Sequence, residues 1–322
     1  MVYNKILNHQ KKSRSVYNEL RNRLIDSVKR NTAEGLLFSG GLDTSILASI
    51  EPKMIAINIS LENYGLDIEY ARLVENFLNL KVHYKKIKID EALEAIPVVI
   101  KILKSFDPAI PNDITIYFGL KFAKELGLKS VMTGDGSDEL FAGYDYMQNL
   151  NTLDSYIKKI TKSMYFSSNE IGKFFDIEIK QPYLDEEFRE FSLKIPANLK
   201  IKKLRHEWVG KWVLRKAFEN TLPKKIIWQN KRPIEYGSGM RKLREIISGL
   251  VSDEEYKNNT YPVKFISKEH LYYYKIYRKV IGKIPEPKDN EKNCPGCGAG
   301  MKQDSFHCRV CGWSGDWREI IN

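Results

Sequence analysis

Hydrophobic side chains follow a helical spacing near the start of the chain and gather in short runs further on. Val16, Leu20, Leu24 and Val28 lie four residues apart, so they would form one stripe along a helix. We therefore predict that the chain opens with an amphipathic helix.

Between residues 35 and 133, short apolar runs alternate with stretches of helical spacing. The runs that predict buried strands are 35–39, 54–60, 82–89 and 130–133. The stretches that predict helices run through 46–50, over 68–78 and up to 126. Strands that alternate with helices imply right-handed crossovers, so we expect an α/β fold, a parallel twisted sheet with helices on both faces.

The remainder of the chain has a different character. From about residue 151 to 282 the pattern is mainly helical. A segment rich in proline and charge, residues 282–290, then leads into a cysteine-containing tail. We expect three parts, residues 1–150, 151–282 and 283–322.

Composition excludes several classes of protein. The 322 residues are 43% hydrophobic and 29% charged, as in an ordinary globular protein. No apolar run approaches the roughly 18 residues of a membrane span, and residues 1–30 carry no signal-peptide core, so we expect a soluble, cytoplasmic protein. All four cysteines lie within residues 294–322, so the main body holds no thiol nucleophile and no disulfide.

The net charge of +11 is unevenly distributed. Residues 151–282 hold 27 basic and 16 acidic side chains, and residues 200–244 alone hold 14 basic and three acidic ones. Such a density attracts polyanions, either nucleotide phosphates or a nucleic-acid backbone. The alternative is a solvated, lysine-rich face.

The first motif with chemical content is Ser-Gly-Gly-Leu-Asp-Thr-Ser at residues 39–45, between a predicted strand and a predicted helix. Its two glycines allow a tight turn close to an anion, and the hydroxyls and the helix N-terminus add donors and partial positive charge. We interpret it as a phosphate-binding loop, distinct from the Walker A loop because it lacks the lysine. Its candidate nucleotide-binding residues are Ser39, Gly40, Gly41, Asp43, Thr44 and Ser45.

The second motif, Thr-Gly-Asp-Gly-Ser-Asp-Glu-Leu-Phe-Ala-Gly-Tyr at residues 133–144, also follows a predicted strand. Gly134 and Gly136, two further candidate nucleotide-binding residues, flank Asp135, which forms an acidic group with Asp138 and Glu139. Carboxylates this close together need a cation, and beside a phosphate loop we expect Mg²⁺. The alternative is an exposed acidic turn with Asp138 as a helix N-cap.

The first motif resembles the pyrophosphate-binding loop of the PP-loop ATP pyrophosphatases, and the two motifs together resemble the synthetase domain of the class B asparagine synthetase family. The segments Gln-Pro-Tyr-Leu-Asp at 181–185 and Trp-Gln-Asn-Lys at 228–231 are similar to further family segments. The resemblance extends over about residues 16–249, and the similar segments follow one another in the same order as in the family. It implies a PP-loop fold of the adenine nucleotide α-hydrolase type.

The resemblance also implies roles for individual residues. Ser39, Gly41, Asp43 and Ser45 would hold the ATP phosphates, with Asp43 and Asp138 binding Mg²⁺. The catalytic residues would be Asp135 near the reacting centre, Asp138, and Lys231, which would meet the charge that develops on the α-phosphate. The strand that ends at Ser60 would border the adenine. Asp185 is better interpreted as a structural cap and Trp228 as a core residue.

The family's reaction joins a carboxylate to the α-phosphorus, releases pyrophosphate, and then lets ammonia displace AMP. For aspartate, the turn at residues 233–239 is a candidate for contacting its other polar groups. Family members begin with a glutaminase domain whose nucleophile is an N-terminal cysteine, and this chain has no early cysteine. We therefore expect nitrogen to arrive as free ammonia or from a separate glutaminase subunit.

The tail carries a second departure from the family. Cys294 and Cys297 form one Cys-x₂-Cys pair and Cys308 and Cys311 another, with ten residues between the pairs. This spacing predicts a four-thiolate Zn²⁺ ribbon, whose folding would depend on the metal. His307 is interpreted as a bystander, and the rings of Phe306, Trp313 and Trp317 would stack on bases or cover the metal site.

Three functions remain open from the sequence. The first is an AMP-forming amide ligase, and the second is a tRNA-modifying enzyme that adenylates a base and uses residues 200–244 and the ribbon to bind RNA. The third is a nucleotide-sensing module. In each case residues 1–150 would be the ATP-binding core, 151–282 a basic helical part that completes it, and 283–322 the linker and zinc ribbon.

Overall fold

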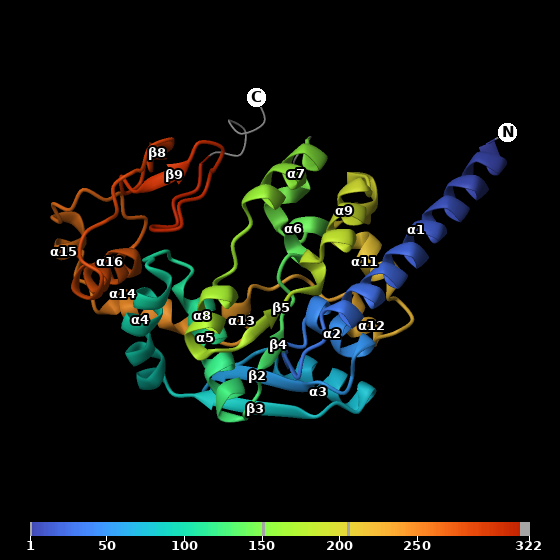
Figure 1. The fold of residues 1–322 in the computed structure, drawn as a ribbon, viewed down its shortest axis with the longest axis horizontal. Coiled ribbons are helices and arrows are strands. Elements are labelled where there is room, and N and C mark those ends of the chain that lie inside the picture. Colours follow the sequence, from blue (N-terminus) through green and yellow to red (C-terminus); the bar gives the residue numbers. More distant parts are fainter. Residues whose placement is uncertain (1, 150–151, 205–206, 316–322) are drawn as a thin grey trace.

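A five-stranded parallel sheet forms the centre of the molecule (Figure 1). The computed structural model describes residues 2–149, 152–204 and 207–315, with the side chains from residue 14 onward. The strand order is β3-β2-β1-β4-β5, and every neighbouring pair is parallel. Its strands are β1 Gly35–Leu37, β2 Ile55–Leu61, β3 Val82–Ile87, β4 Ser130–Met132 and β5 Glu178–Lys180.

Helices account for most of the remaining chain. Those in the first half are α1 Val2–Arg30, α2 Leu42–Ile50, α3 Ile68–Leu78, α4 Ile89–Leu103, α5 Ile110–Glu125, α6 Ser137–Phe141 and η1 Asp145–Asn149. The middle of the chain forms α7 Leu153–Ser163, α8 Ser167–Phe175, η2 Pro182–Leu184, α9 Glu186–Lys194, α10 Ala197–Lys200 and α11 Trp212–Ala217. The last group is α12 Lys224–Ile227, α13 Ile234–Gly237, α14 Lys242–Gly249, α15 Asp253–Lys257 and α16 Lys268–Val280.

The predicted α/β architecture is confirmed, with strand ends that differ by one to two residues. β5 is an addition that the apolar pattern does not predict, because its Glu-Ile-Lys sequence is short, polar and at the sheet edge. A separate antiparallel pair, β6 Lys202–Leu204 with β7 Glu207–Val209, lies, like β5, within the part that the sequence predicts to be mainly helical.

Both faces of the sheet are covered, because successive strand residues point to opposite sides. Leu36, Ala56 and Met132 belong to one apolar cluster with residues of α1, α2 and α11. Ile57 and Val131 belong to a second cluster with residues of α4, α5 and α16. The central strands β1, β2 and β4 are therefore largely buried, while the edge strands β3 and β5 are mostly half-buried.

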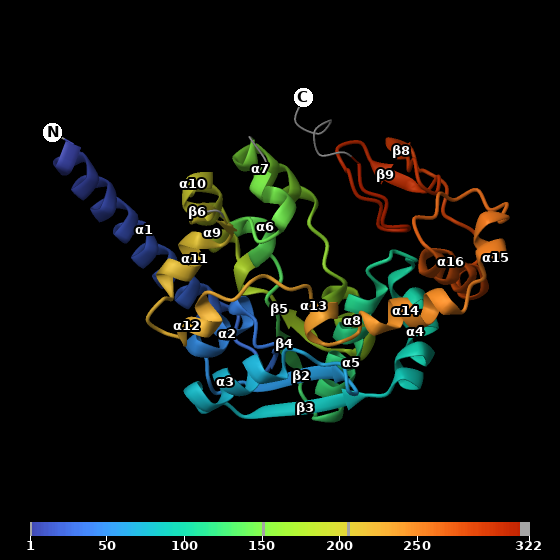
Figure 2. The same ribbon diagram turned by 180° about the vertical axis from the view of Figure 1, so that it is seen from behind.

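The cysteine tail is built into the second cluster. Its hairpin, β8 Glu291–Asn293 with β9 Gly300–Lys302, lies beside α16 and above α4 (Figure 2). The Phe106 N–H donates to the Val310 carbonyl at 2.7 Å, and the Lys264 N–H donates to the Gly296 carbonyl at 2.8 Å. The ribbon, residues 291–315, thus packs against the body of the protein and is not attached to it through the linker alone.

In the described part of the chain, no helix combines the length and the apolar character that a bilayer crossing requires.

Candidate active site

The glycine loop connects β1 to α2 through a turn that only glycine adopts easily. Gly40 has a φ of 79°, and a Cβ there would lie 2.4 Å from the Ala71 backbone nitrogen. The Ser39 hydroxyl accepts a hydrogen bond from the Gly41 N–H at 3.1 Å, which fixes the turn from inside. Backbone close-packing of this kind explains the glycine and places the start of α2 at the edge of the sheet.

The acidic loop connects β4 to α6 in a similar way. Gly136 has a φ of 90°, and a Cβ there would lie 2.2 Å from Leu184 Cδ2. Gly136 is also the N-cap of α6, so the alternative interpretation of Asp138 as an N-cap is wrong. The side chain of Asp138 is only 14% exposed, so the motif is not an exposed turn either.

The two loops meet because β1 and β4 are parallel neighbours whose carboxyl ends share one edge. The Ser137 hydroxyl donates to Asp43 Oδ1 at 2.8 Å. A Cβ on Gly134 would lie 3.3 Å from the Asp43 Cβ. The convergence that the sequence predicts for residues near 40 and near 137 is therefore present.

Two lysines join the carboxylates at this meeting point. Lys211 Nζ lies 2.6 Å from Asp43 Oδ2 and 2.8 Å from Asp138 Oδ1, and its side chain is only 3% exposed. Lys231 Nζ lies 2.6 Å from Asp138 Oδ2. Sequence reasoning selects Lys231 but misses Lys211, whose one signal is its place in the basic segment 200–244.

Charge pairing and burial act against each other at these groups. Burial alone would raise the pKa of Asp138, but Lys211 and Lys231 attract its charged form and donate hydrogen bonds to it, so its pKa lies below the ordinary value. The same pairing outweighs burial and raises the pKa of Lys231. Burial and the neighbouring Asp138 raise the pKa of Glu139 to about 7. The centre therefore keeps a charged Lys231 and an ionised Asp138 beside a weakly acidic Glu139.

Arg215 holds the two lysine-bearing segments together. Its Nε donates to the Gly210 carbonyl at 2.9 Å, and its Nη1 donates to the carbonyls of Ile227 and, at 3.0 Å, Gln229. Gln229 Nε2 in turn donates to the Gly40 carbonyl at 3.2 Å. Both lysines are thereby positioned against the glycine loop by one buried guanidinium.

Asp135 is anchored through one of its oxygens. Asp135 Oδ2 accepts hydrogen bonds from Thr133 Oγ1 at 2.7 Å, Ser168 Oγ at 2.6 Å and Gln181 Nε2 at 2.9 Å. These donors come from the residue after β4, from α8 and from the residue after β5, so the carboxylate has a fixed orientation. Asp135 also lines the cavity described next.

A cavity of about 2110 Å³ opens along this edge of the sheet. The predicted site residues that line it are Ser39, Gly41, Asp43, Thr44, Gly134, Asp135, Gly136, Asp138 and Lys231. Three other candidates, Gly40, Ser45 and Ser60, lie outside its described lining. The residues of β2 that do line it are Ile57, Asn58 and Ile59, and the Asn58 amide donates to the Phe38 carbonyl at 2.9 Å. The turn at residues 233–239 contributes Pro233, Ile234, Gly237 and Ser238.

The carboxylates at this centre fit a divalent cation. Asp43 and Asp138 both face one cation, the Lys211 ammonium, at ion-pair distances. Asp138 Oδ1 is buried and faces Lys211 Nζ at 2.8 Å, so this oxygen already lies where a positive charge is held. Oxygen donors of this type are those that Mg²⁺ prefers.

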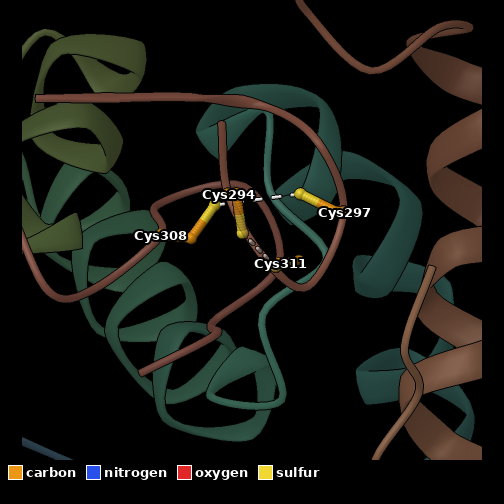
Figure 3. A group of neighbouring side chains, drawn as sticks. All are labelled: Cys294, Cys297, Cys308 and Cys311. Carbon is orange, nitrogen blue, oxygen red and sulfur yellow. Dashed lines mark hydrogen bonds between the residues drawn. The ribbon is translucent and has the colours of Figure 1, made fainter. Parts of the chain in front are cut away.

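The four cysteines form a compact, buried group at the ribbon (Figure 3). All four sulfur atoms lie within 4.8 Å of one another. Cys294 and Cys311 are separated by 3.6 Å between sulfurs, and Cys297 and Cys308 by 3.9 Å. Zn–S bonds of about 2.3 Å in a tetrahedron require sulfur separations of about 3.8 Å, so these residues fit a structural zinc ion.

The other ribbon residues of interest make contacts within the protein. His307 Nε2 pairs with Asp107 Oδ2 at 3.2 Å and is not part of the cysteine group. The Trp313 ring packs against Gly296 and is half-buried, and Phe306 lies 6.0 Å from Tyr156 between ring centroids. Trp317 lies outside the described residues.

Asp185 is a helix cap, as the sequence predicts, whereas Trp228 is only partly buried against the core. Asp185 accepts the Phe188 N–H at 3.2 Å as the N-cap of α9 and pairs with Arg30 at 2.6 Å. Trp228 packs on Trp212 with 5.3 Å between ring centroids, at the border of the cavity.

Much of the basic charge in residues 200–244 is used inside the protein. Lys200, Lys211 and Arg215 are buried. Further residues of the segment pair with nearby carboxylates: Lys216, Lys231, Arg232, Lys242 and Arg244. The segment therefore presents far less free charge than its composition implies.

Comparisons with known proteins agree with the geometry. The family model for asparagine synthase matches residues 19–173 and 157–291. The probable glutamine-hydrolysing asparagine synthetase of Schizosaccharomyces pombe is 30% identical over 285 residues, which cover 74% of this chain and 51% of that protein. Asparagine synthetase B of Escherichia coli K12 is 28% identical over 299 residues, which cover 82% and 54%. The chain thus spans about half the length of the curated relatives it matches.

Among solved structures, the U34-tRNA thiolase NcsA of Methanococcus maripaludis, with its [4Fe-4S] cluster, matches 91% of this chain and 86% of its own. The identity is 14% and the TM-score 0.32. The NH₃-dependent NAD synthetase of Campylobacter jejuni matches 71% of this chain and 96% of its own, at 15% identity and a TM-score of 0.29.

Proposed function

Because the chain belongs to the asparagine synthase family, we propose that it is an ATP-dependent ligase that forms AMP and pyrophosphate. It activates a carboxylic acid, aspartate or a related acid, and transfers ammonia to give an amide. One observation carries this proposal. The glycine loop, the acidic loop and two lysines meet around Asp138 in a single cavity.

In the first step an oxygen of the acceptor carboxylate attacks the α-phosphorus of ATP, and the bond to the β-phosphate oxygen breaks. The products are an acyl-adenylate and pyrophosphate. Negative charge grows on the α-phosphate oxygens and on the departing pyrophosphate. Lys231 meets the first charge, while Lys211 and the N–H groups around Ser39 and Gly41 hold the second. Such fixed cations and donors cost no reorganisation when the charge develops.

Mg²⁺, held by Asp43 and Asp138, would neutralise phosphate charge and orient the triphosphate. Nucleotide binding would use Ser39, Gly41 and Thr44 on the cavity wall. Gly40 and Ser45 act indirectly, because they shape the turn and the buried side of α2. Adenine would lie toward Ile57, Asn58 and Ile59, which line the cavity where β2 passes it.

In the second step ammonia attacks the acyl carbon, AMP leaves, and one proton is released. Asp135 and Glu139 line the same cavity and are the carboxylates that we assign to this step. Three donors hold Asp135 in place, and Glu139, whose pKa is about 7, can accept a proton near neutral pH. Nitrogen would come as free ammonia or from a separate glutaminase subunit.

The alternative of a tRNA-modifying enzyme has less support. It needs a continuous free basic surface, but internal ion pairs and burial use much of the charge in residues 200–244. The ribbon also packs against the protein through Phe106 and Lys264, which leaves it less available as an RNA-docking arm.

A pyrophosphate-release assay with ATP, Mg²⁺, ammonium and a panel of acids tests the proposal. Lys231→Ala should lower kcat at least about 100-fold, the usual cost of losing one charge-stabilising group in a transition state. Lys224→Ala, an exposed lysine in the same basic segment, is the matched control and should keep wild-type turnover. Equal turnover in the two variants would exclude the role given to Lys231.

A further inference from the structure

The cavity is larger than a reaction between ATP and a free amino acid needs. Its volume is about 2110 Å³. Sites for small ligands and cofactors usually measure about 300–1,000 Å³. A substantial part of its wall comes from α7, the segment before α8, and the ribbon, none of which the proposed ATP chemistry uses. This part of the cavity has room for a second molecule of considerable size.

Four aromatic rings connect the catalytic centre to the ribbon along this wall. The rings of Tyr144 and Tyr146 are nearly parallel, with centroids 5.6 Å apart. Tyr146 meets Tyr156 edge-on at 6.0 Å, and Tyr156 lies 6.0 Å from Phe306. We call these four residues the aromatic row, and all of them line the cavity.

The aromatic row begins at the reacting groups. Lys231 Nζ lies 5.7 Å from the centroid of the Tyr144 ring, and the Tyr144 hydroxyl donates to Glu139 Oε1 at 2.6 Å. The hydroxyls of Tyr146 and Tyr156 are 3.1 Å apart and share a hydrogen bond. The row therefore combines flat apolar faces with hydroxyl groups, starting beside the position of the α-phosphate.

The ribbon fixes the far end of the row. Phe306 precedes the Cys308 knuckle by two residues, and its carbonyl accepts the Gly315 N–H at 2.8 Å. The His307–Asp107 pair at 3.2 Å ties the same segment to the loop before α5. Beside it, the Arg309 guanidinium lies 4.4 Å from the centroid of the Tyr165 ring. These contacts fix the part of the ribbon around Phe306 as one wall of the cavity.

We infer that the acceptor is a ring-bearing carboxylic acid larger than a free amino acid, which lies along the aromatic row with its reacting carboxylate near Lys231 and its body against Phe306. This inference rests on the proposed function and adds the class of substrate. Aromatic walls with a few polar groups bind rings by stacking and orient them by hydrogen bonds. The ribbon then acts as a specificity element of the active site.

The test uses the full chain with zinc, ATP, Mg²⁺ and ammonium, and measures pyrophosphate release with four acids. They are L-aspartate, N-acetyl-L-aspartate, N-benzoyl-L-aspartate and D-glucuronate. We expect at least one of the two ring-bearing acids to exceed L-aspartate in kcat/KM by about tenfold or more. N-acetyl-L-aspartate separates the effect of the ring from that of removing the amine charge.

Two leucine variants locate the effect. Phe306→Leu keeps apolar volume but removes the ring, and it should lower the ratio of kcat/KM between the preferred ring-bearing acid and L-aspartate by about fivefold to tenfold. Phe77→Leu, at an exposed position on α3, is the matched control and should keep the wild-type ratio. Tyr146→Leu provides a second position in the row, and zinc content reports whether each variant keeps its ribbon.

Two outcomes distinguish a failure of this inference from a failure of the proposed function. If L-aspartate has the highest kcat/KM and Phe306→Leu leaves the ratio equal to that of Phe77→Leu, the inference fails while the ligase function stands. If none of the acids raises pyrophosphate release above the rate with ATP alone, the proposed function fails and the inference falls with it.

Discussion

Removing the ammonium of Lys211 should destabilise the protein strongly, and Mg²⁺ should compensate in part. Lys211→Met keeps most of the side-chain volume but leaves Asp43 and Asp138 facing each other. Lys211 Nζ lies 2.6 and 2.8 Å from their nearest oxygens, so these oxygens are at most 5.4 Å apart. At that distance, and an effective dielectric constant of about 20, their repulsion is about 3 kcal/mol.

Breaking a buried ion pair from one side typically costs about 3–5 kcal/mol, which agrees with this value. We therefore expect Lys211→Met to lose about 3 kcal/mol of unfolding free energy. The loss should shrink when Mg²⁺ is added, because a divalent cation can bind between the freed carboxylates. The unfolding free energy of the wild type should rise less with Mg²⁺, since Lys211 already neutralises the two carboxylates.

Urea unfolding followed by circular dichroism, with zinc present and with or without Mg²⁺, measures both effects. Lys216→Met is the matched control. It lies on α11, the helix whose N-cap is Lys211, and pairs with Glu219 in a more exposed setting, so its loss should stay within about 1 kcal/mol. Equal unfolding free energies for the two variants would refute the proposed arrangement of charges. A Lys211→Met protein whose unfolding free energy does not change with Mg²⁺ would refute it as well.

Three further predictions follow from other parts of the molecule. Chelation of zinc should unfold residues 291–315 and expose the apolar surface around Phe106. Proteolysis should then begin in the ribbon, and the binding of a hydrophobic dye should rise. A ribbon that resists proteolysis equally with and without chelator would show that the cysteines hold no structural metal. Burial and the nearby Asp107 raise the pKa of Asp113 to about 7. The stability that the protonated Asp113 carboxyl contributes is therefore fully present below about pH 4 and is lost as the pH rises through about 7. Asp113→Asn should therefore gain on the order of 2 kcal/mol relative to the wild type between pH 5 and pH 8, and parallel pH profiles of unfolding would contradict this. Arg215→Met should lower kcat by at least about tenfold. Arg215→Lys should not restore it, because one ammonium cannot reach the carbonyls of Gly210, Ile227 and Gln229 together. A fully active lysine variant would show that charge alone is needed.

The sequence predicts the fold where a pattern is local. The apolar runs near residues 36, 57 and 131 form strands because each is buried on both faces of the sheet. The cysteine spacing likewise predicts the thiolate group, since two knuckles contain all its ligands. β5 escapes the pattern because an edge strand of three residues needs no apolar run.

The parts that could not be predicted depend on contacts between distant residues. Lys211 becomes a site residue only because folding brings it to Asp43, 168 residues earlier in the chain. Ser60 follows the resemblance to the family, yet the residues of β2 on the cavity wall are Ile57, Asn58 and Ile59, which lie one to three positions earlier in the strand. The docking of the ribbon depends on Phe106 and Lys264, which no spacing within the ribbon indicates.

The central claim is that the glycine loop and the acidic loop grip one ATP molecule so that a carboxylate oxygen attacks its α-phosphorus. An acceptor acid that supports turnover, labelled with ¹⁸O in its carboxylate, tests this directly when the nucleotide product is analysed by mass spectrometry. We predict AMP that carries one ¹⁸O atom, together with unlabelled pyrophosphate. ADP as the nucleotide product, with the label in inorganic phosphate, would contradict the account.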